Sequence, residues 1–378
     1  MVVTDLVRTS FTSASTLPGR YYWEPEIYER ERASIFAEMW VCVGRADDVP
    51  EPGRIITVDV GNESVLIVRG RDLDVRAFLN VCRHRGARLC PEASGDVGQV
   101  VQCRYHAWSY SLDGRLVGAP NIAQDEGFDK SEFGLIPVNV DVWEGLIWVN
   151  LADNPAPLRE QLEPTITARM GSIEKFDRWG LGSLVNGKRI VYDVRANWKL
   201  IVENFMECYH CGPVHPELVR LIPDFRNGTS YQGLPGQGTS FGEDIEAFTL
   251  SGKGNRSRLP DLEPEDDRLY YAWVLWPNVF INLLPDHVIL HTLQPLGPDH
   301  SRVTCDWLFE PSEVAKPDFD PSDTVAAFDI TNAQDWDICE LTQLGMTSKA
   351  YAQGGLYVAN ELHITAFRDL ILERIGDV

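Results

Sequence analysis

Two short segments, Cys82-Arg83-His84 and Cys103-Arg104-Tyr105-His106, decide how the first half of this chain folds. Each segment supplies one thiolate and one imidazole, and both groups bind metal ions. Short β-rich runs separated by glycine, aspartate and proline surround the two segments from about residue 41 to residue 151. The pattern predicts a small antiparallel β domain whose loops hold a metal centre.

Two kinds of metal centre use two cysteines and two histidines. A structural zinc site usually takes like ligands in pairs, as in C-x2-C with H-x3-H. A Rieske [2Fe–2S] cluster takes two cysteines on one iron and two histidines on the other. Here each loop gives one cysteine and one histidine, and this interleaving favours a Rieske cluster. Its ligands would be Cys82, His84, Cys103 and His106. Such a cluster passes on electrons, so it predicts a second site where they are used.

A second candidate site lies in NWKLIVENFMECYHCGPVHPEL, which contains Glu207, His210 and His215. We expect a helix from about residue 198 to 209, on which Glu207 and His210 share a face because they are three residues apart. Gly212-Pro213 should break this helix, so that His215 returns from a turn. Two histidines and a carboxylate make the facial triad of non-haem iron(II) oxygenases.

Cysteines on both sides of His210 leave zinc open as an alternative at this second site. Cys208 and Cys211 form a C-x2-C pair, which is a common zinc-binding spacing. Zinc has no redox chemistry, however, and an electron-carrying cluster requires an acceptor for its electrons. If the second site holds iron, it supplies the electron acceptor that the cluster requires, and the cluster supplies the electrons that the iron site uses.

Composition narrows the class of protein further. The chain has 378 residues, enough for two substantial domains, and 34 basic against 56 acidic residues give a net charge of −22. We expect neither nucleic acid nor a membrane as partner, because so acidic a surface repels phosphate and anionic lipid and no apolar run is long enough to span a bilayer. The eight dispersed cysteines and the lack of an apolar N-terminal signal region favour a reducing, cytoplasmic location.

The reducing equivalents must come from another protein. We find no G-x-G-x-x-G after a strand and no plant-type ferredoxin cysteine run in the sequence. We therefore expect a separate flavin-dependent, NAD(P)H-oxidising reductase as partner, with or without a ferredoxin.

The chain resembles the catalytic α subunit of Rieske non-haem iron oxygenases along nearly its whole length. Beyond the metal motifs, the resemblance rests on Asn197-Trp198-Lys199 and Glu203-Asn204-Phe205. It implies an α+β fold, with a small antiparallel β Rieske domain inserted into a helix-grip (START-like) catalytic domain that has a central antiparallel sheet and C-terminal helices. The expected boundaries are 1–40 for an N-terminal arm and helix of the catalytic domain, 41–151 for the Rieske domain and 152–378 for the catalytic domain.

The resemblance also implies roles that spacing alone does not assign. The family's carboxylate ligand lies on a C-terminal helix that matches NAQDWDICELTQLGM, where Asp335 takes the ligand position. Asp337 is the competitor, and on a helix it points away from Asp335. His210, His215 and Asp335 would then bind iron, whereas Glu207 would bridge an iron-bound histidine and a cluster histidine of a neighbouring subunit. The family forms head-to-tail homotrimers, which are closed heterologous rings.

Glu207 also carries the best clue to the substrate. Many ring-hydroxylating members have aspartate there, whereas E-C-Y-H-C resembles members that oxidise glycine betaine, stachydrine and carnitine. This resemblance implies that no second subunit type is needed. We expect oxidative N-demethylation of a betaine-like quaternary ammonium compound with O2. Ring hydroxylation of an aromatic compound is the alternative, and an electron carrier that has lost its iron is the rival from another class. Candidates for an aromatic cage around the cation are Tyr209, Tyr271, Trp273, Trp276 and Phe280.

Overall fold

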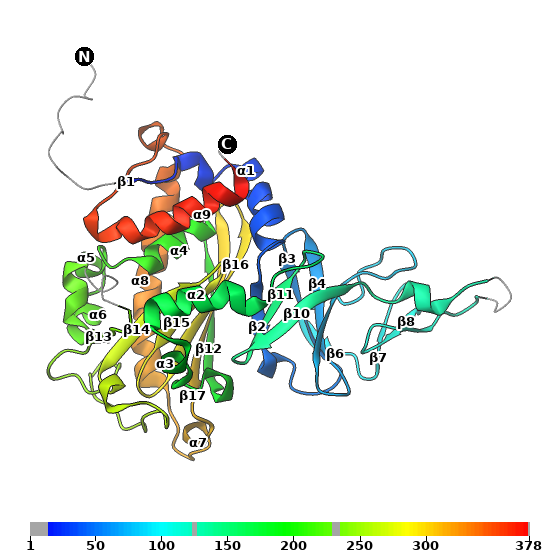
Figure 1. Ribbon diagram of the computed structural model, residues 1–378, viewed down its shortest axis with the longest axis horizontal. Coiled ribbons are helices and arrows are strands. Elements are labelled where there is room, and N and C mark those ends of the chain that lie inside the picture. The colour runs from blue at the N-terminus through cyan, green and yellow to red at the C-terminus, as the bar shows by residue number, and fades with distance from the viewer. Residues whose placement is uncertain (1–13, 123–126, 229–234, 377–378) are drawn as a thin grey trace. The chain divides into compact units, whose positions relative to one another are not determined.

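The computed structural model describes residues 14–122, 127–228 and 235–376, so the first thirteen residues of the expected N-terminal arm lie outside the described part. The chain forms two compact units (Figure 1). The first comprises the described parts of Met1–Glu29, Glu163–Gly180 and Leu184–Val378, and the second comprises Arg30–Leu162 with Leu181–Ser183. The second unit is thus inserted in the sequence of the first.

The inserted unit is built from antiparallel strands. Seven of them form a sheet in the order β2-β11-β10-β5-β4-β3-β6, and three more form a smaller sheet in the order β7-β8-β9. The inner strand β4 reads Ser-Val-Leu-Ile-Val over most of its length and is buried on both faces. The strands are β2 (Val41–Arg45), β3 (Arg54–Val60), β4 (Glu63–Arg69), β5 (Val75–Leu79), β6 (Ser94–Asp96), β7 (Val100–Gln102), β8 (Ser109–Ser111), β9 (Leu116–Gly118), β10 (Pro137–Trp143) and β11 (Leu146–Asn150).

The other unit contains a six-stranded antiparallel sheet in the order β12-β17-β16-β15-β14-β13. Its strands are β12 (Val185–Val194), β13 (Thr239–Ser240), β14 (Leu269–Leu275), β15 (Val279–Leu283), β16 (Val288–Gly297) and β17 (His300–Phe309). A separate pair joins β1 (Ala14–Ser15) to β18 (Leu356–Tyr357). With its helices, this unit confirms the expected α+β class and the central antiparallel sheet.

Helices of this unit bring the second motif onto the sheet. Helix α4 contacts β14 and β16, α8 contacts β12, and α4 and α8 contact each other. The sequence predicts helices at about 322–345 and 357–375; α8 confirms the first, and the second forms as a 3-10 helix (Ala359–Ile364) followed by α9. The helices of the chain are α1 (Pro25–Glu31), α2 (Leu158–Met170), α3 (Ile173–Asp177), α4 (Trp198–Met206), α5 (Cys211–Val214), α6 (Pro216–Leu221), α7 (Pro311–Val314), α8 (Ser322–Met346) and α9 (Thr365–Ile375).

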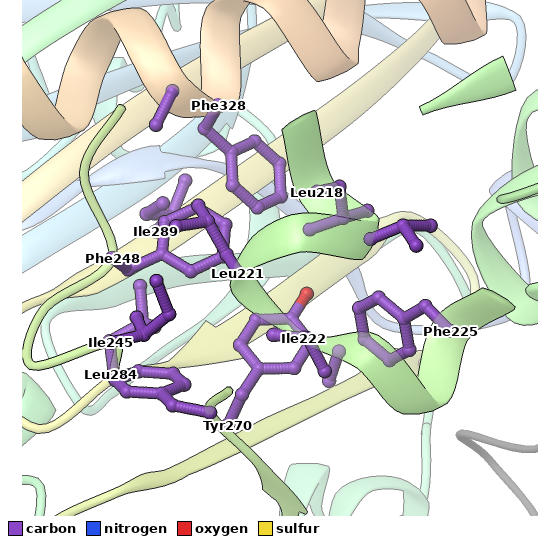
Figure 2. Packing of buried hydrophobic residues seen from close by; sticks show 14 of the residues in the cluster. Leu218, Leu221, Ile222, Phe225, Ile245, Phe248, Tyr270, Leu284, Ile289 and Phe328 are labelled. Atoms are coloured by element: carbon purple, nitrogen blue, oxygen red, sulfur yellow. The ribbon is translucent and has the colours of Figure 1, made fainter. Parts of the chain in front are cut away.

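A hydrophobic cluster lies on one face of this sheet beside the second motif. Figure 2 shows Leu218 and Leu221 of α6 together with Phe328 of α8 and Tyr270 of β14. Successive side chains of a strand point to opposite faces, so Tyr270 enters the cluster whereas Tyr271 points away from it. The stretch from Gly228 to Asp267 is rich in glycine, serine and aspartate, and its lack of periodicity predicts a long loop or lid. Its described residues, 235–267, pack here through Phe241, Ile245 and Phe248. No helix among the described residues is long and apolar enough to cross a membrane.

Candidate metal centres

The two Cys/His loops share one backbone design. In each, the carbonyl oxygen of the cysteine accepts a hydrogen bond from the N–H four residues later, and its own N–H donates to the carbonyl five residues later. The four bonds are Gly86 N to Cys82 O at 3.0 Å, Cys82 N to Ala87 O at 2.8 Å, Ala107 N to Cys103 O at 3.0 Å and Cys103 N to Trp108 O at 2.8 Å. The fourth residue is left-handed in both loops, with φ of 74° at Gly86 and 56° at Ala107.

These loops bring the four predicted cluster residues together. Cys82 and Cys103 are buried and their side chains are neighbours. The rings of His84 and His106 lie with their centroids 4.6 Å apart. Two buried thiols beside two imidazoles in antiparallel-sheet loops match the donor set of a Rieske cluster, so the residues present fit this group.

Two aromatic residues shape the surroundings of this donor set. Trp108 is buried and stacks on His84 with a centroid distance of 4.9 Å. Its ring therefore shields His84 from water on that side. Tyr105, whose place next to His106 in the second loop predicts a cover as well, is 58% exposed. Tyr110 was not singled out from the sequence, yet its hydroxyl lies 3.3 Å from the Cys82 sulfur. A hydrogen bond to a cluster sulfur is one of the ways in which a protein sets the reduction potential.

Three donor atoms converge at the second motif. His210 Nε2 lies 3.1 Å from His215 Nε2, and Asp335 Oδ1 lies 2.9 Å from His215 Nε2 and 3.2 Å from His210 Nε2. Ligands that are about 2.1 Å from a metal and at right angles to one another are about 3 Å apart. The three atoms therefore fit one face of a metal coordination sphere, and Asp337 on the same helix is exposed to solvent.

The polypeptide reaches this arrangement differently from the sequence expectation. Helix α4 ends at Met206, and Glu207 is its C-cap in extended conformation, with φ of −127° and ψ of 162°. Glu207 therefore does not share a helix face with His210; a turn brings its carboxylate onto His210 Nδ1. Gly212-Pro213 lies inside the short helix α5 rather than breaking a longer one, and His215 follows at its end.

Each histidine uses its other ring nitrogen for a different partner. His210 Nδ1 contacts the carboxylate of Glu207. His215 Nδ1 is 2.7 Å from the side-chain oxygen of Gln334, whose amide nitrogen donates to Glu217 at 3.2 Å. Such contacts fix the tautomer and leave Nε2 free for a metal. Gln334 and Glu217 were not found from the sequence, because nothing in their spacing connects α6 with α8.

The charges around the three donors favour a bound cation. Burial disfavours a charged imidazolium, but hydrogen bonds to Asp335 and Glu207 outweigh it and raise the pKa of His210 to about 10. Burial also disfavours a charged Asp335, but its contacts with His210 and His215 lower the pKa of this carboxyl to about 2. Carboxylates that hold a proton on His210 stabilise a divalent ion in the same place. The chemistry of the donor set thus fits a mononuclear iron(II).

A small cavity of about 40 Å³ opens beside these donors. Its apolar lining is largely aromatic, and its charged residues are acidic; the described lining residues include no lysine or arginine. The lining consists of Asn204, Phe205, Glu207, Cys208, His210, Cys211, His215, Leu218, Phe225, Tyr270, Phe328, Thr331, Asn332, Asp335 and Trp336. None of the five aromatic residues chosen from the sequence is among them. Which side chains face the cavity is decided by strand parity and tertiary packing, and the sequence alone does not show these.

Cys208 and Cys211 are joined by a disulfide in this structure. Both are buried, at 4% and 2% exposure, and both line the cavity. The other six cysteines are free.

Comparisons with known proteins agree with the two centres. The family model "Rieske [2Fe-2S] domain" matches residues 39–140, and "Ring hydroxylating alpha subunit (catalytic domain)" matches residues 181–377. The chain is 33% identical to the glycine betaine monooxygenase oxygenase subunit of Chromohalobacter salexigens, over 94% of this chain and 84% of that protein. It is 30% identical to the carnitine monooxygenase oxygenase subunit of Acinetobacter baumannii, over 90% and 88% of the two chains.

Comparison with a solved structure agrees with these sequence matches. The quaternary ammonium Rieske monooxygenase CntA in complex with L-carnitine superposes with a TM-score of 0.73 at 26% identity, covering 96% of each chain. The chain belongs to the family of Rieske ring-hydroxylating oxygenase α subunits. This confirms the family resemblance, the enzyme class and the two cofactors, a Rieske cluster and a mononuclear iron. Rieske oxygenases receive their electrons from a separate reductase and act with O2.

Proposed function

We propose that this oxygenase oxidises an N-methyl group of a small quaternary ammonium compound. The observation that carries the proposal is the cavity lining, in which Phe205, Phe225, Tyr270, Phe328 and Trp336 stand beside acidic side chains. Aromatic faces and nearby carboxylates attract a cation that has no hydrogen-bond donors. The names of the relatives, which act on glycine betaine and carnitine, support the same substrate class.

The reaction would be a monooxygenation. One oxygen atom of O2 enters a C–H bond of the N-methyl group, and the other leaves as water with two electrons and two protons. The resulting carbinolamine breaks its C–N bond and gives formaldehyde and the demethylated amine. When bound, the mononuclear iron supplies the activation of O2, and the Rieske cluster supplies electrons one at a time.

We assign the protein groups as follows. Cys82, His84, Cys103 and His106 hold the cluster, and His210, His215 and Asp335 hold the iron. Glu207 keeps the proton of His210 on Nδ1 and links this ligand to the protein surface, where a cluster histidine of a neighbouring subunit would dock. The aromatic side chains orient the ammonium group so that a methyl carbon faces the three donor atoms.

Assembly and location belong to the same proposal. The chain would form a homotrimer in which the electron crosses from one subunit to the next, and it would work in the cytoplasm beside a flavin-dependent, NAD(P)H-oxidising reductase. Glu207 is only partly buried, and His84 is exposed on its own unit. Both observations support an electron-transfer route between subunits.

The test is a substrate screen with the purified holoenzyme and a Rieske-oxygenase reductase. Glycine betaine, carnitine, choline and aromatic acids are supplied separately, and formaldehyde, O2 uptake and residual substrate are measured. We expect one formaldehyde per substrate consumed with a quaternary ammonium compound. A ring diol or phenol formed without formaldehyde would reject N-demethylation and support the alternative, ring hydroxylation.

A further inference from the structure

The C-x2-C pair formed by Cys208 and Cys211 has no part in the oxygenase chemistry described above. It lies within the iron motif, one cysteine directly after Glu207 and the other directly after His210. Both sulfurs belong to side chains that line the cavity of the iron donors. A pair of buried sulfurs at this position affects the metal site both when the pair is reduced and when it is oxidised.

The backbone holds the two cysteines ready to pair. Their Cα atoms are 4.8 Å apart, within the usual range of about 4.4–6.8 Å for a disulfide. Cys211 N donates to Cys208 O at 3.1 Å, which closes the turn between them. Cys211 O in turn accepts from His215 N at 3.0 Å, so the same turn also positions a metal ligand.

Cys211 is also within reach of the metal. One donor atom each of His210, Cys211 and His215 lies within 4.8 Å of the others, and these three residues can form a metal-binding group. Thiolate is a soft ligand that favours zinc, whereas histidine with carboxylate alone suits iron(II). A sulfur that is bound to another sulfur has no thiolate to offer, so the disulfide removes Cys211 from the possible ligands.

We propose that the oxidation state of Cys208 and Cys211 sets the metal preference of this site. With the disulfide closed, His210, His215 and Asp335 are the ligands and the site suits iron. With the disulfide reduced, Cys211 joins them and makes a four-ligand site that favours zinc, which cannot carry out redox chemistry. This inference rests on the proposed iron ligands and is independent of the proposed substrate.

The oxidation balances with hydrogen peroxide, which forms whenever O2 takes two electrons and two protons without oxidising substrate. One sulfur attacks a peroxide oxygen, the O–O bond breaks, and a sulfenic acid and water form. The second thiol displaces the hydroxyl, so an S–S bond and a second water result. A dithiol reductant reverses the step by thiol–disulfide exchange and becomes a disulfide itself.

The first measurement establishes the disulfide. Holoenzyme is treated with peroxide or with a dithiol, unfolded, alkylated and digested, and the peptide containing residues 208–211 is weighed. We expect two alkyl groups on this peptide after the dithiol and none after peroxide. Free thiols at both positions after peroxide, or sulfinic acid in place of a disulfide, would overturn the proposal.

The second measurement identifies the ligands. The mononuclear iron is removed by a chelator with the cluster kept in place, one equivalent of zinc is added, and X-ray absorption is recorded at the zinc edge, where the cluster irons do not contribute. We expect a sulfur neighbour at about 2.3 Å in the reduced protein, and only nitrogen and oxygen at about 2.0–2.2 Å in the oxidised protein. If zinc in the reduced protein has imidazole neighbours but no sulfur neighbour, the inference about Cys211 is wrong and the assignment of the histidine ligands stands. If zinc has no imidazole neighbours, the assignment of the histidine ligands is wrong.

Three variants separate the pair from other cysteines. Cys208→Ser cannot form the disulfide, so the zinc–sulfur contact should persist after peroxide followed by arsenite, which reduces sulfenic acids but not disulfides. Cys211→Ser should lack this contact in either state. Cys339→Ser, which removes another buried thiol on α8, is the matched control and should behave as wild type. If Cys211→Ser does not fold, persistence of the contact in Cys208→Ser after peroxide and arsenite still decides the question, and its loss there contradicts the proposal.

Discussion

His215 is fixed at both nitrogens of its ring, and the partner on the outer side is a neutral amide. Gln334 can turn either its oxygen or its nitrogen towards the histidine. Glu217 decides between them, because a carboxylate only accepts hydrogen bonds and therefore holds the amide nitrogen on its own side. The amide oxygen then faces His215 Nδ1, which must carry the proton, and Nε2 keeps its lone pair for the metal.

Replacing Gln334 should therefore weaken iron binding. Gln334→Leu leaves the Nδ1–H of His215 buried without an acceptor, and loss of such an outer partner typically weakens metal affinity about 10–100-fold. Iron content after dialysis against graded chelator concentrations measures the change. Gln343→Leu is the control, since Gln343 lies on the same helix but bonds Asn197 and Tyr22. It should lower the melting temperature and leave iron affinity unchanged; equal iron loss in both variants would refute a positioning role.

At the scale of elements, the two cluster loops share one backbone conformation but have different residues at the left-handed position. Gly86 adopts φ of 74° at no steric cost, and a Cβ there would meet no atom within 4 Å. Ala107 adopts φ of 56°, a conformation that costs an L-residue roughly 1–2 kcal/mol. Ala107 therefore carries backbone strain, whereas Gly86 in the other loop does not.

Exchanging these residues should shift stability in opposite directions. Gly86→Ala should lower the free energy of unfolding of the Rieske unit by about 1 kcal/mol, and Ala107→Gly should raise it by roughly 0.5 kcal/mol, because greater freedom of the unfolded chain offsets part of the relief. Chemical denaturation followed by the visible absorption of the cluster measures both. A stabilising Gly86→Ala would show that backbone strain does not govern these loops.

A partly buried carboxylate links α4 to the segment of Tyr22 and to β18. Glu203 of α4 accepts hydrogen bonds from Tyr22 at 2.8 Å and from Tyr357 of β18 at 3.1 Å. Burial raises the pKa of Glu203 to about 7 even though both hydroxyls stabilise its charged form. In the unfolded chain a glutamate has a pKa of about 4.3. The folded state thus binds the proton more tightly, and this stabilisation is complete below about pH 4.3 and lost by about pH 7.

Glu203→Gln should remove that pH dependence. We expect the unfolding free energy of wild type, relative to this variant, to fall by roughly 2 kcal/mol between pH 4.5 and 7.5, less than the full shift implies because the side chain is only partly buried. Urea unfolding at several pH values checks the difference, and Glu340→Gln serves as a control on a more exposed carboxylate. Parallel pH curves for wild type and Glu203→Gln would contradict the expectation.

For the whole molecule, the proposed trimer predicts that damaged subunits complement each other. A Cys103→Ser chain lacks a complete cluster, and an Asp335→Ala chain lacks an iron ligand, so each should be inactive alone. In a head-to-tail ring, a junction works when an intact cluster faces an intact iron site of the next subunit. Random mixing of equal amounts satisfies this at about one junction in four.

Coexpression of the two variants with separate affinity tags tests this arrangement. Doubly purified trimers contain both chains, and each such closed ring has one working junction in three, so they should recover about a third of the wild-type activity per chain. The controls are each variant coexpressed with itself. Oligomers that contain both chains and remain inactive would mean that electrons stay within one subunit.

The residue patterns by themselves pointed to the two cluster loops and to the two histidines of the second motif, whereas the family resemblance supplied the α+β class. The loops and histidines are local features, because a few residues of one loop place a cysteine and a histidine together whatever the rest of the chain does. The family resemblance pointed to Asp335, and only tertiary structure brought it to His215, which is 120 residues away. The tertiary structure also decided which aromatic residues face the cavity, that Gln334 and Glu217 support His215, and that Cys208 and Cys211 pair. Each of these depends on strand parity, helix ends and packing between distant segments, which residue spacing does not encode.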